Sequence, residues 1–279
     1  MAVNDLITVG ATPLVVQAYW AAGGSDWFAD AQRAQALGRR LEAGLRHLRR
    51  RLGRRRDAGA RRHRRGRPHR PRRRRAPASS ARRRACRSAT RSAPGDAIVL
   101  LASSGIHANG LSLARKLAER LPQGYLTPID AAPCRRYGEA LLAPTVLYSP
   151  ITEALFARRH RAALLPPTSP ATAGASCMRH RSRTHLPHPR ACPTVPPVLQ
   201  FIQQRSRHRT IARPTARFNM GAGFALFVAA EDAERSGRGR ARKARRRRLV
   251  AGRVEAGPKR LVIEPLGIEY AGSELGVRV

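Results

Sequence analysis

Residues 95–117 carry the pattern that decides the fold, and they read GDAIVLLASSGIHANGLSLARKL. The apolar run 98–101 follows a Pro-Gly-Asp turn signal and is short enough to be a buried strand. Small and polar residues then fill 103–110, which predicts a loop. The leucines after this loop are spaced to share one helix face: Leu111, Leu113, Leu117 and Leu121. The stretch therefore predicts a strand, a loop and a helix in succession, as in a mixed α/β fold.

Apolar periodicity and turn residues indicate further regular structure on both sides of this stretch. Residues 1–37 contain a strand-like segment over 14–19 and an amphipathic helix over 26–37. Helical material over 137–155 is interrupted at Pro144 and Pro150. Three more structured segments are expected: 195–204, a glycine-containing turn into a strand over 218–228, and a strand over 261–264.

The positive charge of the chain is concentrated in three arginine-rich ranges, 39–91, 158–217 and 235–248. The 55 lysines and arginines face 17 acidic residues, and these ranges hold 45 of the 55. The other 152 residues carry 10 basic and 15 acidic side chains, a balance typical of an ordinary enzyme. We expect the arginine-rich ranges to be disordered, because they offer little apolar surface to offset chain entropy and arginine self-repulsion.

The sequence carries no sign of a membrane or secretory destination. No apolar run approaches the ~20 residues that span a bilayer. The start of the chain lacks the basic and apolar regions of a signal peptide. Three of the four cysteines lie in the arginine-rich ranges, so no disulfide framework is indicated. These features predict a cytoplasmic location.

Five stretches, in this order along the chain, match motifs of one enzyme family. They are Ala2-Val3-Asn4-Asp5-Leu6 with Gly10-Ala11-Thr12-Pro13-Leu14; Gly95-Asp96 with residues 103–110 and Leu113-Ala114-Arg115-Lys116; Tyr137-Gly138-Glu139-Ala140-Leu141-Leu142-Ala143-Pro144-Thr145; Phe218-Asn219-Met220-Gly221-Ala222-Gly223; and Gly252-Arg253-Val254-Glu255. Together they resemble the aminoimidazole ribonucleotide synthetase family, which comprises the phosphoribosylformylglycinamidine cyclo-ligases of purine biosynthesis and close relatives. Each stretch alone is a weak signal, whereas five in order are specific.

The resemblance implies a two-domain α/β fold and an ATP-dependent ligase. In the family, ATP activates the formyl-amide oxygen of formylglycinamidine ribonucleotide, and an amidine nitrogen then closes the imidazole ring. The implied cofactors are ATP and Mg²⁺. The implied assembly is a homodimer, to which the N-terminal domain supplies strands of a barrel. On this chain the two domains correspond to residues 1–93 and 94–279.

The chain departs from the family in the arginine-rich ranges and at its start. The family has a Gly-Gly-Glu-Thr loop and a Thr-Gly-Gly or Thr-Gly-His loop in place of two of these ranges, and a further strand upstream of the Asn-Asp motif. GC-rich glycine codons that are read out of register become arginine codons. Codons compatible with 52–60 spell Trp-Gly-Gly-Gly-Glu-Thr-Pro-Ala one base later. Codons compatible with 167–178 spell Asn-Ile-Thr-Gly-His-Gly-Trp two bases later. We interpret the ranges as frameshifted coding sequence and expect little or no activity.

The resemblance assigns ligand contacts to residues of three motifs. Asp5 is the expected magnesium ligand, with Asn4 beside it in the ATP site; the alternative is an ordinary turn at a strand end. The other residues expected to contact ATP or the ribonucleotide are Ser103, Ser104, Gly105, His107, Asn109, Gly110, Asn219, Gly221 and Gly223. The loop amides would point at an anion near the helix start, or the serines would merely cap that helix. The glycines would admit a ligand close to the backbone, or serve packing.

Two other classes of function stay open beside the cyclo-ligase. The first is another ATP-using enzyme of the same superfamily, related to selenophosphate synthetase or thiamine-phosphate kinase; the motif at 218–221 favours the cyclo-ligase. The second is a nucleic-acid-binding protein with unspecific electrostatic contacts. The scarcity of lysine and of interleaved aromatic residues argues against it. A cysteine–histidine cluster fits no standard zinc spacing: Cys177, His180, His185, His188 and Cys192.

Overall fold

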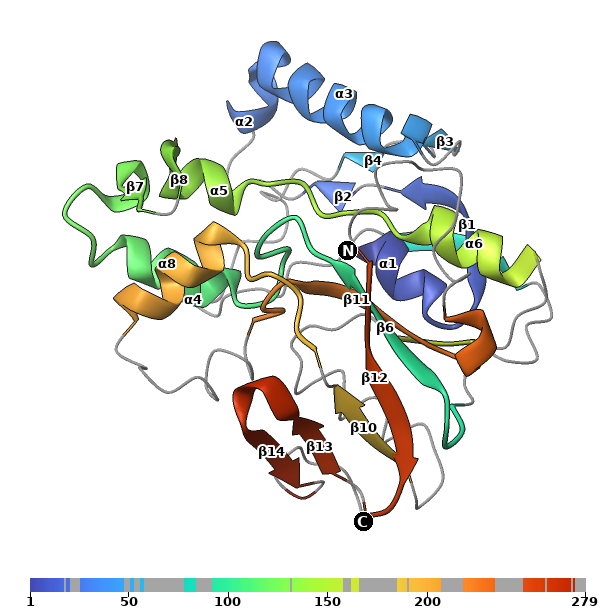
Figure 1. The fold of residues 1–279 in the computed structure, drawn as a ribbon. Coiled ribbons are helices and arrows are strands. Elements are labelled where there is room, and N and C mark those ends of the chain that lie inside the picture. Colours follow the sequence, from blue (N-terminus) through green and yellow to red (C-terminus); the bar gives the residue numbers. More distant parts are fainter. Residues whose placement is uncertain are drawn as a thin grey trace.

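The computed structural model describes most of the chain outside the arginine-rich ranges (Figure 1). The described residues are 1–17, 19–20, 26–47, 51–52, 56–57, 78–83, 92–130, 132–157, 162–165, 185–189, 191–206, 218–233, 248–258, 260–271 and 273. Most of the three arginine-rich ranges, 39–91, 158–217 and 235–248, lies outside these residues. The prediction that these ranges are disordered therefore falls mostly on residues that the structure does not describe.

A five-stranded sheet forms the centre of the fold, with strand order β10-β12-β6-β11-β9 and every neighbouring pair antiparallel. Its strands are β6 (Ala97–Ala102), β9 (Ala162–Leu165), β10 (His185–Pro189), β11 (Ala222–Val228) and β12 (Arg248–Ala256). The expected strands at 98–101 and 218–228 are thereby confirmed as the central pair. Val99 of β6 lies opposite Leu226 of β11 and Val250 of β12, which sets the register on both sides.

Alternate residues of the two central strands point into two separate apolar layers, as the period of a strand requires. Every residue of β11 is buried. One layer contains Val99, Leu101, Phe224 and Leu226, together with side chains of α6 (Ser149–Ala157). The opposite layer contains Ile98, Ala225 and Phe227 from these strands and Ala251 and Val254 from β12. Because both faces of β6 and β11 are covered, these strands carry almost no polar side chains.

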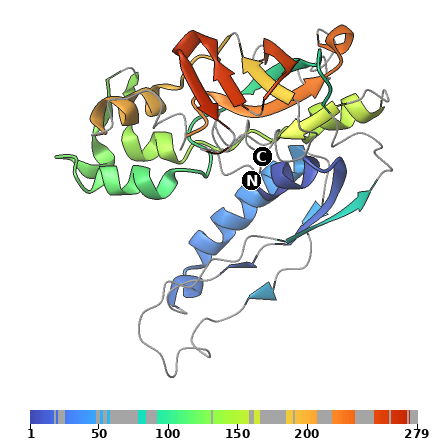
Figure 2. The same ribbon diagram turned by 90° about the horizontal axis from the view of Figure 1, so that it is seen from below.

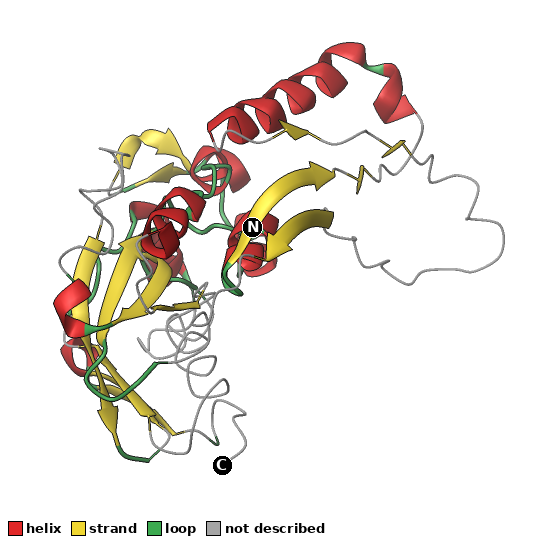
Figure 3. Cartoon of the chain, turned by 90° about the vertical axis from the view of Figure 1, so that its right-hand side faces the viewer, coloured by secondary structure: helices red, strands yellow, loops and turns green. Residues whose placement is uncertain are grey.

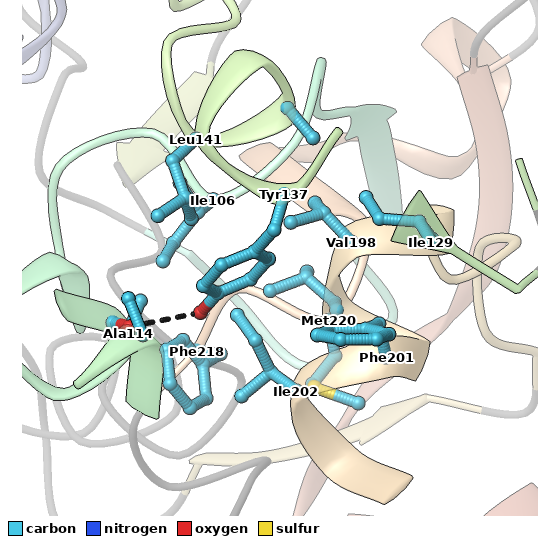
Figure 4. Close-up of a cluster of buried hydrophobic side chains, with 13 residues drawn as sticks. Ile106, Ala114, Ile129, Tyr137, Leu141, Val198, Phe201, Ile202, Phe218 and Met220 are labelled. Carbon is cyan, nitrogen blue, oxygen red and sulfur yellow. Dashed lines mark hydrogen bonds between the residues drawn. The ribbon is translucent and has the colours of Figure 1, made fainter. Parts of the chain in front are cut away.

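A small helical layer lies beside one end of the sheet. Its elements are α4 (Leu111–Ala118), η2 (Gly124–Leu126), α5 (Tyr137–Leu141) and α8 (Pro197–Arg205), with the short strands β7 (Pro128–Ile129) and β8 (Ala132–Arg136). Figure 4 shows how the side chains of these elements converge around Tyr137, whose hydroxyl donates to the backbone oxygen of Ala114 at 2.9 Å. The ring of Tyr137 also packs on Phe201 of α8, with 5.2 Å between centroids. The leucine face expected on α4 contacts this layer, as the spacing predicts.

Pro150 lies in the first turn of α6 and does not interrupt a helix. It occupies the second position of α6, where its missing N–H would have no partner within the helix. The break expected in this region therefore lies over 142–148, between α5 and α6.

The N-terminal part of the chain extends to one side of the central sheet (Figures 2 and 3). It comprises α1 (Ala2–Ile7), β1 (Ala11–Gln17), β2 (Tyr19–Trp20), α2 (Asp26–Ala29), α3 (Ala31–His47), β3 (Arg51–Leu52), β4 (Arg56–Asp57) and β5 (Ala78–Arg83). Strand β1 lies between β3 and β5.

Two expectations for this N-terminal part need correction. Asn4 and Asp5 lie within α1 and not in a turn at a strand end. The helix forms because Val3 and Ile7, one turn apart, both bury their side chains. The helix expected over 26–37 is divided at Asp30 into α2 and α3, and α3 continues to His47, so the first part of the range 39–91 is helical. Ion pairs one turn apart, such as Arg46 with Glu42 at 2.8 Å, support this exposed helix.

The end of the described chain forms a separate hairpin. Strands β13 (Arg260–Ile263) and β14 (Ile268–Ala271) pair around η4 (Glu264–Leu266), and η3 (Ala230–Asp232) follows β11. The strand expected over 261–264 is confirmed as β13. Among the described residues, no helix combines the length and the apolar character that a membrane crossing requires. The division into domains 1–93 and 94–279 stays a prediction.

Candidate functional site

The candidate site lies where β6 ends and β11 begins. Because the strands are antiparallel neighbours and Ala102 is opposite Ala222, the 103–110 loop and the 218–221 turn meet at one edge of the sheet. The backbone N–H of Ser103 donates to the oxygen of Gly221 at 2.8 Å. The two glycine-containing motifs, more than a hundred positions apart in the sequence, are thus brought together by the pairing of these strands.

Asn219 joins the loop to the turn with all the hydrogen-bonding groups of its side chain. Its Nδ2 donates to the backbone oxygens of Gly105 at 2.8 Å and Ile106 at 3.2 Å. Its Oδ1 accepts from the hydroxyl of Ser103 at 3.0 Å and from the N–H of Gly221 at 2.9 Å. An amide side chain has two donor protons and two acceptor lone pairs, so that of Asn219 is fully used. It is also buried, with 2% of its surface exposed.

The glycines of the turn are packed tightly against their surroundings. Gly221 has φ 98°, and a Cβ there would lie 2.6 Å from the backbone oxygen of Thr194. A Cβ on Gly223 would overlap the hydroxyl of Tyr148 and come within 2.9 Å of His107 Cε1. Both positions therefore require glycine for packing. The prediction that these glycines also admit a ligand stays a prediction.

The 103–110 loop carries a run of backbone N–H groups without an acceptor. Within the part of the chain that the structure describes, the N–H groups of residues 105–110 donate to no acceptor, and the side-chain amide of Asn109 has no partner. In contrast, the serines are engaged: the N–H of Ser104 donates to His107 Nε2 at 3.3 Å, and its hydroxyl donates to the oxygen of Pro144 at 2.6 Å. The capping alternative for the serines is not realised, because α4 has Gly110 at its N-cap and no side-chain cap bond.

His107 is held in one uncharged form. Its backbone has φ 58°, an uncommon value for a residue with a Cβ. Burial lowers the pKa of the imidazole from 6.5 to about 4, and the positive charge of the Met1 amino group adds to this effect. Because Nε2 accepts the N–H of Ser104, the ring proton resides on Nδ1. His107 can therefore offer a fixed, neutral hydrogen-bond donor.

Tyr148 is a residue of this region that the motifs did not single out. It is buried, and its hydroxyl donates to the oxygen of Ala102 at 2.7 Å, directly before the loop. Its ring centroid lies 6.4 Å from that of His107. Tyr148 follows a proline-containing segment with no periodic signal, so only the tertiary structure places it here.

Asn4 reaches the same region through Tyr148. Its Nδ2 donates to the oxygen of Val146 at 2.8 Å, and its Oδ1 accepts the N–H of Tyr148 at 3.2 Å. The side chain is buried, with 2% of its surface exposed. The observed role of Asn4 is thus to hold the segment that carries Tyr148.

The described residues do not assemble a magnesium site around Asp5. The carboxylate of Asp5 is exposed on α1. Among the described residues, no three histidine, cysteine or acidic side chains lie close enough together to hold a metal ion. Mg²⁺ prefers octahedral oxygen coordination with one or more carboxylates and bound phosphates. Asp5 would supply one such oxygen group, so the residues present do not by themselves form the expected site.

Comparison with solved structures identifies the class of fold. Hydrogenase maturation protein HypE superposes with a TM-score of 0.57 at 16% identity, over 96% of this chain and 78% of that chain. A structure of HypE in complex with ATP gives a TM-score of 0.55 at 16% identity, over 96% of this chain and 75% of that chain. The chain therefore has the mixed α/β fold of the HypE and aminoimidazole ribonucleotide synthetase type, as expected from the motifs.

Sequence comparison identifies similar proteins whose enzymatic activity is named. Over 149 residues the chain is 34% identical to the phosphoribosylformylglycinamidine cyclo-ligase of Paraburkholderia xenovorans (strain LB400). This match covers 51% of the chain and 39% of that protein, so the chain spans about two fifths of the relative it matches. No protein-family model matches the chain. The resemblance to cyclo-ligases drawn from the five stretches is confirmed.

Proposed function

We propose that the 103–110 loop and the 218–221 turn bind a phosphorylated small molecule in a chain derived from an ATP-dependent cyclo-ligase. The observation that carries this proposal is the run of N–H groups over 105–110 that find no acceptor among the described residues. Consecutive backbone amides next to a helix start attract anions through their partial positive charges. The loop is already fixed by Asn219, so little ordering would be needed when a phosphate binds.

The comparisons support the kind of ligand. Relatives by sequence are named as cyclo-ligases, and HypE, which has a similar fold, has been solved in complex with ATP. The ancestral reaction we propose is ring closure of formylglycinamidine ribonucleotide to aminoimidazole ribonucleotide. In this reaction ATP would supply the phosphoryl group that activates the formyl-amide oxygen.

The residues of the site would contribute binding and orientation. The amides of 105–110 would receive phosphate oxygens, and Asn109 would add a side-chain donor. His107 would donate from Nδ1 without carrying a charge, because its pKa of about 4 keeps it neutral near neutral pH. Magnesium, when bound, would neutralise phosphate charge. Asp5 is the one described residue that we assign to it.

The chain as written should lack turnover for an electrostatic reason. Phosphoryl transfer needs metal-held charge compensation, and Asp5 alone does not provide a carboxylate set. The family has a glutamate in its Gly-Gly-Glu-Thr loop. In this chain the corresponding segment lies in the range 39–91 and is rich in arginine instead. Those arginines would attract ATP loosely, so nucleotide binding alone would not demonstrate function.

The test is release of ADP that depends on formylglycinamidine ribonucleotide. The chain as written should give none, whereas a version with the reading frame restored and extended upstream should give turnover. Asp5→Asn in the restored version should lower the rate. Substrate-dependent turnover by the chain as written would overturn the proposed damage. Full activity of the Asp5→Asn variant would remove Asp5 from the site but leave the relationship to cyclo-ligases standing.

A second candidate is another ATP-using enzyme of the superfamily, related to selenophosphate synthetase or thiamine-phosphate kinase. The fold shared with HypE, over 96% of the chain at 16% identity, is compatible with this candidate as with the cyclo-ligase. The restored chain should then consume ATP with selenide or thiamine phosphate and not with the ribonucleotide.

We also propose a cytoplasmic homodimer. The exposure of Val9 and Leu14, at 49% and 41%, beside and on β1 supports an association of the N-terminal strands. Light scattering of the restored chain should give twice the mass of one chain, and a monomer would contradict this.

A further inference from the structure

We propose that Asn219 is a positioning residue that aims two backbone donors of the loop, the N–H groups of Ile106 and His107, at the bound anion. This inference rests on the proposed anion site. It assigns Asn219 a role that differs from the ligand contact expected from its motif.

The first step concerns the capacity of Asn219 to bind anything else. Its two donor protons go to the oxygens of Gly105 and Ile106, and its oxygen accepts from Ser103 and Gly221. No proton or lone pair is left for a ligand. Because the side chain is buried at 2% exposure, a ligand would also have to displace the loop to reach it. Asn219 therefore acts on a ligand through the loop.

The second step follows from the geometry of the peptide bond. In a planar trans peptide the C=O and the following N–H point in opposite directions. Asn219 holds the oxygens of Gly105 and Ile106, so the N–H groups of Ile106 and His107 point away from it. These N–H groups are two of those that meet no acceptor among the described residues. The side chain thus determines the direction of both donors.

The third step is that the loop needs such a restraint. Gly105 has φ 150°, in the region that glycine enters freely, so steric hindrance alone does not fix the peptide that follows it. Asn219 itself is anchored, since its backbone oxygen accepts the N–H of Ala222 at the start of β11 at 2.9 Å. Strand β11 therefore fixes the position of Asn219, and the side chain of Asn219 in turn restrains the loop.

The experiment compares amide nitrogen–proton NMR spectra of the full chain and of two variants, with inorganic phosphate as the probe. A site-resolved readout is needed because the 55 basic residues will bind phosphate elsewhere. Asn219→Asp retains an acceptor for Ser103 and Gly221 but lacks the protons that hold the two loop oxygens. Asn219→Ala removes all four bonds. The matched control is Tyr137→Phe, which loses one buried hydrogen bond, to the oxygen of Ala114, and leaves the loop oxygens held.

In the unaltered chain, phosphate should shift the Ile106 and His107 resonances. In Asn219→Asp, both resonances should be displaced before phosphate is added, and half-saturation should need at least about tenfold more phosphate. Resonances of β6 and β11 should stay in place, and Tyr137→Phe should respond as the unaltered chain does. Unmoved Ile106 and His107 resonances in both Asn219 variants would overturn the proposal. An equal loss in Tyr137→Phe would also overturn it, because the role would then be structural only. If phosphate shifts neither resonance in the unaltered chain, the proposed anion site fails, while displacement by Asn219→Asp still supports the positioning role.

Discussion

At the scale of single residues, the candidate site depends on side chains whose hydrogen-bonding groups are engaged in holding the backbone. Asn4 satisfies its side-chain amide with main-chain partners, Asn219 does so with main-chain partners and the Ser103 hydroxyl, and His107 accepts a neighbouring N–H. The groups left for a ligand are backbone amides of the loop, the side-chain amide of Asn109 and the Nδ1 proton of His107. A motif residue that looks like a ligand contact in the sequence can therefore serve to orient the groups that make the contact.

His107 should make stability depend on pH. Its pKa is lowered in the folded chain to about 4 from 6.5, so between these values the unfolded chain binds more protons. The free energy of unfolding should therefore fall as pH decreases from about 6.5 to about 4, by up to about 3 kcal/mol from this residue. Urea unfolding across this pH range measures the effect.

The control for this prediction is His107→Asn, since asparagine tolerates a positive φ and does not titrate. Carboxylates and the other histidines titrate in both proteins, so the difference between the two pH profiles isolates His107. The variant should lose less stability on acidification. Parallel profiles would show that His107 does not contribute.

At the scale of elements, neighbouring strands and helices decide what each glycine does. Gly223 is the second residue of the buried strand β11, and a Cβ there would meet Tyr148, His107 and the backbone of Ser103. Gly38 lies in the exposed helix α3, where a Cβ would meet nothing within 4 Å. The same residue type is thus required in one element and replaceable in the other.

Replacing these two glycines by alanine should have effects of opposite sign. Gly223→Ala should destabilise the fold by at least about 1–3 kcal/mol, because the neighbours that it meets belong to a packed core. Gly38→Ala should stabilise by about 0.5–1 kcal/mol, because alanine favours the helix. Chemical denaturation of both variants measures the pair. A tolerated Gly223→Ala would show that the contact between β11 and Tyr148 is looser than the structure indicates.

At the scale of the whole molecule, the chain combines an ordered α/β fold with ranges of very different composition. The described elements of 92–157 and 218–271 supply β6, β11 and β12 of the central sheet and part of the helical layer. The residues outside the arginine-rich ranges have an enzyme-like charge balance. The arginine-rich ranges fall mainly outside the described residues. Strand β9 of the central sheet ends at Leu165, shortly before residues 167–178, whose codons are compatible with Asn-Ile-Thr-Gly-His-Gly-Trp in another frame. The damaged reading frame stays a prediction.

The gene sequence tests the frameshift directly. The codons for residues 52–60 should spell Trp-x-Gly-Gly-Glu-Thr-Pro when read one base later, because glycine-rich loops encoded by GC-rich codons become arginine runs in another frame. Sequencing of the gene gives the answer. Codons such as AGA or CGT at Arg54 and Arg55 would not give the glycine codons in the shifted frame, and they would contradict the hypothesis.

The sequence by itself determined the local structure and the family resemblance. The strand at 98–101, the loop at 103–110 and the helix face with Leu113 and Leu117 follow from periodicity and turn residues, which act over a few positions. The resemblance also predicted that the motifs at 103–110 and 218–223 both contribute to ligand binding. The prediction that Asn4 and Asp5 lie at a strand end was wrong, because burial of neighbouring apolar side chains stabilises the helix α1 there.

The tertiary structure decided how the site is made. Only the antiparallel pairing of β6 with β11 places Ser103 beside Gly221 and lets Asn219 hold the loop oxygens. Only packing places Tyr148 between Ala102 and Gly223. These contacts join residues that are far apart in the chain, and their geometry depends on strand register and side-chain direction. Because a local pattern contains neither, such contacts cannot be predicted from the residues one segment at a time.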